Sequence, residues 1–200
     1  MSNRKRSCHP TGPLIIFAAC CAVQIWTIGH SNRTLDQFTE LLTAHQIQLL
    51  ADVRRFPGSR RLPHFNQENL AQSLPRIGIE YIHFPELGGR RKVRPDSPNT
   101  VWRNEAFRGY ADFMMTPEFR AGIERLLQHA AEKRTAFMCS EALWWQCHRS
   151  MISDFLKAAG HEVIHILAVN KTERHPFTSA ARIVNGKLSY SPEIESQLLF

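Results

Sequence analysis

Short apolar runs alternate with stretches of helical spacing along the chain from residue 24 onward. Each apolar run is closed by polar or turn-forming residues, which is typical of buried strands. Five such strands are predicted, at residues 24–28, 48–53, 80–84, 135–139 and 163–167. After residue 170 the pattern indicates one weaker strand, at residues 181–184.

The segments between these strands place apolar residues on one face of a helix. A first helix is expected after Thr34, because threonine is a favourable N-cap residue. Its inward face would consist of Leu35, Phe38, Leu41 and Leu42. Further helices are expected after Asn66, across residues 107–114, after Thr116, and from Cys147 or His148.

Strands that alternate with helices indicate βαβ units. The predicted fold class is therefore α/β, a single three-layer domain with a mainly parallel sheet and helices on both faces. A chain of 200 residues, 43% of them hydrophobic, is long enough for one sizeable core. We expect residues 24–170 to form this domain and residues 171–200 to be a C-terminal tail that completes it.

Residues 1–23 precede the first predicted strand. Arg4-Lys5-Arg6 and the apolar run at 14–23 resemble a short signal peptide, and residues 17–20 loosely resemble a lipoprotein cleavage box. Cleavage at Cys20 would leave almost no spacer before the first strand, so we favour an N-terminal extension, disordered or created by an upstream start codon. The run is too short to span a bilayer, and no membrane association is expected.

The five cysteines are odd in number and have no regular spacing. This favours reduced thiols in a cytoplasmic protein over a disulfide framework. The formal net charge is +7, and the pI is about 9.5. Between Arg54 and Arg108 lie nine further basic residues, namely Arg55, Arg60, Arg61, Arg76, Arg90, Arg91, Lys92, Arg94 and Arg103. This segment favours an anionic small molecule or nucleic acid as a partner; the alternative is a solvated basic loop.

The densest cluster of reactive side chains lies between the fourth strand and the next helix. Cys139 is at the strand end, Glu141 follows it, and Cys147 and His148 are at the helix start. Amides at a helix N-terminus and the adjacent Arg149 can lower the pKa of a thiol, and His148 can exchange a proton near neutral pH. We therefore predict that Cys139, Glu141, Cys147 and His148 are catalytic. The alternative is that both cysteines are small core residues.

Polar residues also follow the first two strands, and the carboxyl ends of parallel strands are where such sheets bind ligands. The predicted ligand-binding residues are Gly29, His30, Ser31, Asp52, Arg54 and Arg149. Two alternatives remain open: residues 29–31 can form only a tight turn, and Asp52 and Arg54 can form only a structural ion pair.

Zinc is a further alternative, because Cys139, Glu141, Cys147 and His148 all have side chains that can ligate it. Their spacing matches no zinc pattern, and the cluster contains no Cys-x-x-Cys. We therefore expect no metal or other cofactor.

Taken together, these clusters resemble the domain of unknown function 488 family (DUF488). The resemblance covers residues 24–170 and rests on Thr27-Ile28-Gly29-His30-Ser31, Asp52-Val53-Arg54, Pro57, Ser59, Phe65, Tyr81-Ile82-His83, Pro85-Glu86-Leu87-Gly88-Gly89, Cys139-Ser140-Glu141, Cys147-His148-Arg149 and His165. It implies a compact α/β domain but no settled reaction. Residues 142–146, with two tryptophans, are more apolar than the resemblance implies.

A strand-end cysteine also begins the anion loops of rhodaneses and low-molecular-weight phosphatases. In this chain the sixth residue after Cys139 is Trp145 rather than the arginine that closes such a loop. The leading hypothesis is therefore a thiol-dependent enzyme of unspecified reaction that acts on a phosphorylated or nucleobase-containing ligand, with Cys147 as nucleophile or redox thiol. The alternatives are a non-catalytic nucleic-acid-binding module and a zinc-binding protein.

Overall fold

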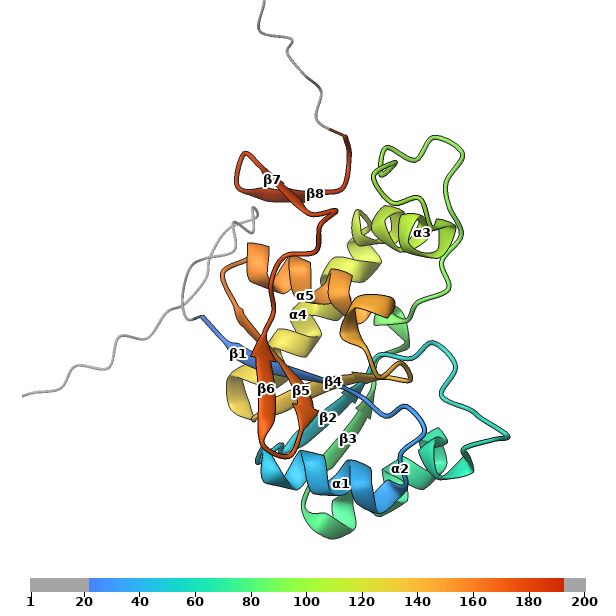
Figure 1. Cartoon of the computed structure of the whole chain (residues 1–200), viewed down its shortest axis with the longest axis vertical. Coiled ribbons are helices and arrows are strands. Elements are labelled where there is room, and N and C mark those ends of the chain that lie inside the picture. The colour runs from blue at the N-terminus through green and yellow to red at the C-terminus, as the bar shows by residue number, and fades with distance from the viewer. Residues whose placement is uncertain (1–21, 193–200) are drawn as a thin grey trace, which may run out of the picture.

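A six-stranded sheet runs through the middle of the computed structural model, which describes residues 22–192 (Figure 1). The strand order is β3-β2-β4-β1-β5-β6. The strands are β1 (Gln24–Gly29), β2 (Leu49–Asp52), β3 (Glu80–His83), β4 (Thr135–Cys139), β5 (Glu162–Ala168) and β6 (Lys171–Arg174). All neighbouring strands are parallel except β5 and β6, which are antiparallel. The predicted α/β class with a mainly parallel sheet is confirmed.

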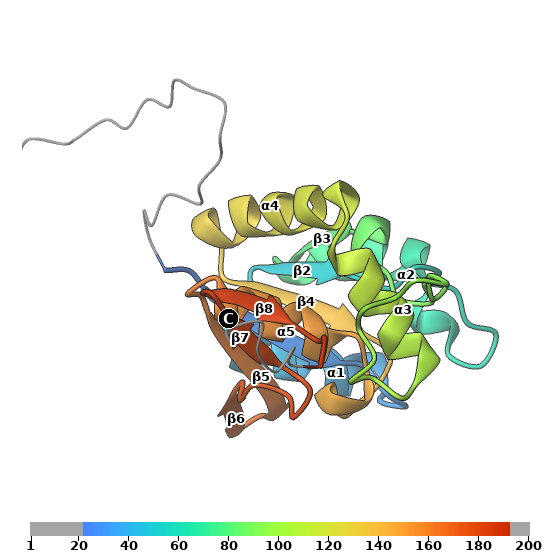
Figure 2. The ribbon, with the colours of Figure 1, turned by 90° about the horizontal axis from the view of Figure 1, so that it is seen from above.

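Helices cover both faces of this sheet, as predicted, with α4 on one side and α1 on the other (Figure 2). The helices are α1 (Leu35–Ala44), α2 (Gln67–Ser73), α3 (Glu105–Met114), α4 (Pro117–Glu132) and α5 (Arg149–Ala158). Single 3-10 turns lie at η1 (Pro63–Phe65), η2 (Pro75–Ile77), η3 (Pro85–Leu87) and η4 (Trp144–Gln146). Residues of α1 and α2 belong to one buried apolar cluster, and residues of α3, α4 and α5 belong to the other.

Alternation along the strands explains how one sheet serves two cores. Ile25 packs in the cluster that contains α5, whereas its neighbour Trp26 packs in the cluster that contains α1. In β4, Phe137 and Met138 separate in the same way. Consecutive side chains of a strand point to opposite faces, so a strand buried on both sides is apolar throughout.

The strand order brings together segments that are far apart in the sequence. β4 lies between β1 and β2, so that Gly29 pairs with Cys139 and Asp52 pairs with Met138. The carboxyl ends of these three strands therefore meet at one edge of the sheet. The loops that follow them contain the polar clusters identified in the sequence.

Local capping agrees with the predicted helix starts at two of three positions. Thr34 forms a capping box with Gln37 at the start of α1, and Thr116 caps α4 ahead of Pro117. Asn66 occupies the N-cap position of α2 but makes no side-chain cap bond. Its Oδ1 instead accepts a hydrogen bond from the amide of Ser59, which fixes the loop after β2.

The chain after β5 contains more strand than the apolar pattern indicates. The weak candidate corresponds to β7 (Arg182–Val184), which pairs with β8 (Lys187–Ser189), whereas β6 and β8 were not predicted. β6 is exposed along its whole length, so no apolar run marks it. The β7–β8 hairpin lies against α5, and Tyr190 is buried in the core cluster of that helix (Figure 1).

Most of the predicted N-terminal extension, including its three cysteines, lies outside the described residues. The last eight residues lie outside them as well. Within residues 22–192, no helix has the length and apolar character needed to span a membrane.

Candidate active site

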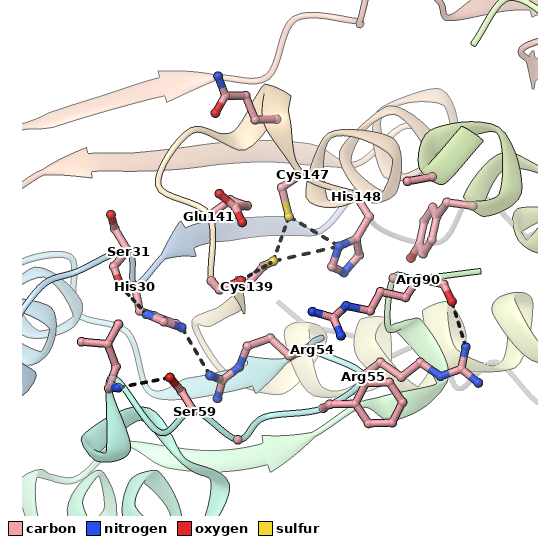
Figure 3. Close-up of a pocket in the computed structure, with 18 of the residues that line it drawn as sticks. His30, Ser31, Arg54, Arg55, Ser59, Arg90, Cys139, Glu141, Cys147 and His148 are labelled. Atoms are coloured by element: carbon pink, nitrogen blue, oxygen red, sulfur yellow. Dashed lines mark hydrogen bonds between the residues drawn. The ribbon is translucent and has the colours of Figure 1, made fainter. Parts of the chain in front are cut away.

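An open pocket of about 540 Å³ lies at the carboxyl ends of β1, β2 and β4 (Figure 3). It is lined by loops after four strands and by the start of α3. Seven of the predicted site residues line it: His30, Ser31, Arg54, Cys139, Glu141, Cys147 and His148. The other three, Gly29, Asp52 and Arg149, do not.

Two thiols and one imidazole meet on the inner wall of this pocket (Figure 3). Cys139 ends β4, and Cys147 precedes α5; their Sγ atoms are 2.9 Å apart. The Nδ1 atom of His148 lies 3.4 Å from the Cys147 Sγ and 4.0 Å from the Cys139 Sγ. Both cysteines are about 5% exposed or less. They are accessible only through the pocket.

The orientation of His148 assigns its tautomer. Its Nε2 lies 3.0 Å from the backbone carbonyl of Val53, which can only accept, so Nε2 carries the proton. In the neutral ring Nδ1 is then an acceptor that faces both sulfurs. A side chain on Gly89 would crowd this ring, because its Cβ would lie 3.0 Å from Nδ1. His148 is therefore held with its acceptor nitrogen toward both sulfurs.

The two thiols have opposite electrostatic environments. The hydrogen bond donated by Cys147 holds the pKa of Cys139 well below its usual value, with further help from His148 and Arg149. Burial raises the pKa of Cys147, and the adjacent Cys139 thiolate raises it further. The pair therefore favours a thiolate on Cys139 and a thiol on Cys147. The sequence-based hypothesis placed the nucleophile on Cys147.

Arg149 lies in the protein interior rather than in the pocket, with 1% of its surface exposed. Its guanidinium donates to the Thr27 hydroxyl at 3.0 Å and to the Glu141 carbonyl at 2.5 Å. A Cβ on Gly29 would overlap the same carbonyl oxygen. Gly29 and Arg149 therefore hold the loop after Cys139 against β1 and do not contact the pocket.

Asp52 and Arg54 form a buried ion pair, and Arg54 also reaches the pocket. Both Asp52 carboxylate oxygens accept hydrogen bonds from Arg54, at 2.8 and 2.6 Å, and Tyr81 donates to the same carboxylate at 2.7 Å. A further bond from Arg54 to the Phe65 carbonyl fixes the guanidinium. The structural ion pair considered from the sequence is thus present, and Arg54 in addition lines the pocket.

His30 lies beside Arg54 as a neutral ring. Its Nδ1 donates to the Ser31 carbonyl at 2.8 Å, and its Nε2 accepts from Arg54 at 3.3 Å. Burial, and then the charge of Arg54, lower the pKa of His30 to about 4. The amides of His30 and Ser31 donate to the carbonyls of Cys139 and Ser140, which joins the ends of β1 and β4. His30 and Ser31 therefore lie in a tight turn directly after β1, and both also line the pocket.

The loop between Cys139 and Cys147 is anchored in the core by one of its two tryptophans. Glu141 is exposed at the pocket, and only its backbone carbonyl has a bonded partner. Trp144 is buried and stacks on His165 at 4.4 Å, whereas Trp145 is 49% exposed. The apolar character of this loop thus reflects an anchor in the core.

Arg55, Arg90 and Tyr110 also line the pocket, but they were not singled out as site residues from the sequence. The two arginines are exposed, and Arg55 donates to the Arg90 carbonyl at 3.2 Å. Other members of the basic segment have partners within the protein. Arg91 contacts Glu118 and the Phe113 ring, and Arg94 pairs with Asp96. The density of basic residues identified the segment in the sequence. It did not indicate which of its arginines line the pocket.

Comparison with known protein families gives a match. The model of the family described as Domain of unknown function DUF488 matches residues 34–156, a span that includes β2, β3, β4 and most of α5. No match is found among curated proteins or among solved structures. The matched span exceeds half of the chain and includes the two thiols, His148 and Arg54. The chain therefore belongs to the DUF488 family.

Proposed function

We propose that this protein is a thiolate-dependent enzyme that acts on a small anionic ligand, phosphorylated or nucleobase-containing. One observation supports the proposal above all others. The Sγ atoms of Cys139 and Cys147 and the Nδ1 atom of His148 lie within 4.0 Å of one another on the wall of a pocket that is also lined by exposed arginines.

The proposed chemistry begins with transfer of the Cys139 proton to Nδ1 of His148. The Cys139 thiolate then attacks an electrophilic atom of the ligand, and the imidazolium returns the proton to the leaving group. Cys147 stabilises the thiolate through its S–H donor. Glu141, exposed at the same pocket, is placed to accept a proton from a water molecule that releases the covalent intermediate.

The ligand class follows from the charges and rings along the pocket. Within residues 22–192, neither Arg55 nor Arg90 is in an ion pair, and both line the pocket, with the Arg55 guanidinium bonded to the Arg90 carbonyl (Figure 3). Guanidinium groups bind phosphate oxygens in a bidentate manner. The rings of Phe56 and Phe107 line the same pocket and are not fully buried, so they offer faces for a base.

The nucleophile assignment is tested by alkylation of the reduced full chain with iodoacetamide between pH 5 and 10, read by mass spectrometry. Cys139 is expected to react below pH 7, with a midpoint well under the reference thiol pKa of about 8.5. Cys147→Ala removes the S–H donor and is expected to move that midpoint upward. If both thiols stay inert until the protein unfolds, they are core residues and the proposal fails.

The ligand class is tested by calorimetry with inorganic phosphate, ribose 5-phosphate, adenosine and adenosine monophosphate. The double variant R55A/R90A is expected to weaken binding of the phosphorylated probes at least tenfold, because each lost charged hydrogen bond contributes about 1.5–3 kcal/mol. Arg76→Ala removes an exposed arginine outside the pocket and is the matched control. Equal losses in both variants would indicate non-specific attraction to a basic protein.

A zinc site is the second candidate, favoured by one observation. One ligand atom each from Cys139, Cys147 and His148 lies within 4.8 Å of the others. Tetrahedral zinc with Zn–S bonds of about 2.3 Å holds its sulfurs roughly 3.8 Å apart, so the two Sγ atoms would have to separate. Stoichiometric zinc in protein purified without a metal-affinity tag, lost in Cys139→Ser, would support this alternative. Metal-free folded protein with a reactive Cys139 would exclude it.

A further inference from the structure

The two buried sulfurs are closer than van der Waals contact and farther apart than a bond. Their 2.9 Å separation compares with about 2.05 Å in a disulfide, so closure requires a shift of about 0.9 Å. Cys139 is the last residue of a strand, whereas Cys147 lies in extended backbone between η4 and α5. Bond formation therefore need not unwind α5.

We propose that Cys139 and Cys147 are a two-electron redox pair, oxidised to an intramolecular disulfide by a hydroperoxide that enters the pocket. This inference rests on the proposed function only in taking Cys139 as the thiolate. It adds a second reaction at the same site. In the oxidised state Cys139 is part of the disulfide and is no longer a nucleophile.

The first step forms a sulfur–oxygen bond. The Cys139 thiolate attacks one peroxide oxygen, the oxygen–oxygen bond breaks, and the departing oxygen takes a proton from the His148 imidazolium. The products are a sulfenic acid on Cys139 and one molecule of alcohol, or of water when the oxidant is hydrogen peroxide. Sulfur loses the two electrons that the peroxide gains.

The second step forms the disulfide. Cys147 transfers its proton to Nδ1 of His148, 3.4 Å away, and its sulfur attacks the Cys139 sulfur. The sulfenic hydroxide leaves with that proton as water. In total, two thiols and one hydroperoxide give one disulfide, one alcohol and one water. A dithiol reductant is required to restore the pair.

Three features of the site favour this sequence over further oxidation of Cys139. Cys147 is already in contact, so it captures the sulfenic acid before a second peroxide arrives. His148 faces both sulfurs and can act in both steps. The two cysteines are buried, so a large protein thiol cannot reach the oxidised sulfur. Redox-sensor cysteines share this arrangement of a low-pKa thiolate beside a resolving thiol.

The chain provides a direct assay for the bond. No lysine or arginine lies between Cys139 and Cys147, so trypsin releases both cysteines in one peptide, residues 135–149. A disulfide between them makes that peptide two hydrogen atoms lighter and resistant to alkylation. A mixed or intermolecular disulfide instead attaches a second species. The cysteines at positions 8, 20 and 21 lie in other peptides.

The experiment treats the reduced full chain with one equivalent of hydrogen peroxide, blocks free thiols, digests under non-reducing conditions and weighs peptide 135–149. We expect the internal disulfide, with loss of both thiols in this peptide and their recovery after dithiothreitol. Cys147→Ser should stop at a sulfenic acid on Cys139 that dimedone labels. Cys139→Ser should leave Cys147 unmodified.

Two other outcomes would overturn the redox proposal. Dimedone labelling of Cys139 in the unaltered chain, without the disulfide, would show that Cys147 does not resolve it. A peptide with both thiols intact after peroxide treatment would show that the pair is not peroxide-reactive. Alkylation of Cys139 below pH 7 would in either case leave the proposed nucleophile standing. The proposed function fails only if alkylation fails as well.

Discussion

At the scale of single residues, the site depends on which atom of a side chain faces which partner. His148 donates through Nε2 to a carbonyl and therefore presents Nδ1 to the sulfurs. His30 has the reverse arrangement, with Nδ1 bonded to a carbonyl and Nε2 facing Arg54. The first ring can take a thiol proton. The second is occupied by a cation and is held neutral.

Replacement of His148 is expected to weaken the Cys139 thiolate. His148→Ala removes a group that lowers the pKa of Cys139, so alkylation of Cys139 at pH 6.5 should slow about tenfold. The difference should vanish above the thiol pKa. His45→Ala changes an imidazole bonded to the Ala168 carbonyl, outside the pocket, and should leave the rate unchanged. Equal rates in both variants would mean that His148 has no electrostatic effect on Cys139.

His30 is expected to make the fold sensitive to acid. Its pKa is about 4 in the folded protein and about 6.5 when unfolded, so below pH 6.5 the unfolded chain binds the proton more strongly. The free energy of unfolding should therefore fall by about 2 kcal/mol between pH 7 and pH 5 on account of this ring. Burial lowers the pKa of His165 to about 2, and that ring contributes a similar loss.

Urea unfolding at pH 7 and pH 5 measures this effect. In His30→Gln the free energy of unfolding should fall between pH 7 and pH 5 by roughly half as much as the two rings together cause, since only the His165 contribution remains. His45→Ala again provides the comparison. A fall of the same size in His30→Gln as in the unaltered chain would show that His30 titrates alike in both states.

Residue types in the site were predictable from the sequence, but their directions were not. The run from Cys139 to Arg149 marked a cluster of reactive groups. Arg149 nevertheless turns inward to a carbonyl, and Glu141 contributes its carbonyl to that bond. The ordering of the two thiol pKa values follows from a hydrogen bond between side chains eight residues apart. No local pattern encodes it.

At the scale of elements, the pocket is shaped by loops that approach one another closely. Gly29 is the clearest case, because its Cα faces the Glu141 carbonyl that Arg149 also holds. Gly88 lies similarly against the backbone of Arg55. These glycines let the loops after β1 and β3 pack against their neighbours. Glycine is needed at these positions because a side chain would not fit. The backbone conformation does not require it, since neither residue has a positive φ.

A side chain at position 29 is therefore expected to displace the loop after Cys139. Gly29→Ala should destabilise the fold by about 1–3 kcal/mol, the range for inserting a methyl group into a packed region. Gly58→Ala is the matched control, because a Cβ there meets nothing within 4 Å. Chemical denaturation of the two variants measures the difference. Equal stability would mean that the loop moves at no cost.

Helices and strands were predictable where burial produces a regular spacing of apolar residues. All five parallel strands were located from their apolar runs, and the α1 and α4 starts from their caps. The exposed β6 and the short β8 were missed, because strands at an edge need no apolar residues. Helix α5 begins at Arg149, one residue beyond His148, since His148 takes the N-cap position.

At the scale of the whole molecule, the site exists because β4 inserts between β1 and β2. This order places Cys139 between the loop that carries His30 and the loop that carries Arg54. The sequence indicated that these groups lie at the same edge of a parallel sheet. It did not indicate which strands are neighbours, because strand order depends on long-range packing of helices on both faces.

The segment after β6 is joined by hydrogen bonds to α5, the helix that follows His148. Asp154 in α5 is completely buried, and its carboxylate accepts hydrogen bonds from three residues beyond β6. They are the ring of His175 at 3.1 Å, the amide and hydroxyl of Thr178 at 2.9 and 2.6 Å, and the hydroxyl of Tyr190 at 2.8 Å. One carboxylate thus fastens residues 175–190 to the helix.

Asp154→Asn is expected to release this segment and lower the free energy of unfolding by about 3 kcal/mol, because an amide cannot accept all four hydrogen bonds. Asp96→Asn removes an exposed ion pair and should cost less than about 1 kcal/mol. Hydrogen exchange at the amide of Thr178 should rise in Asp154→Asn and stay unchanged in Asp96→Asn. If that amide stays protected while the protein is destabilised, the carboxylate supports the core of α5 alone and the segment is held by the burial of Tyr190.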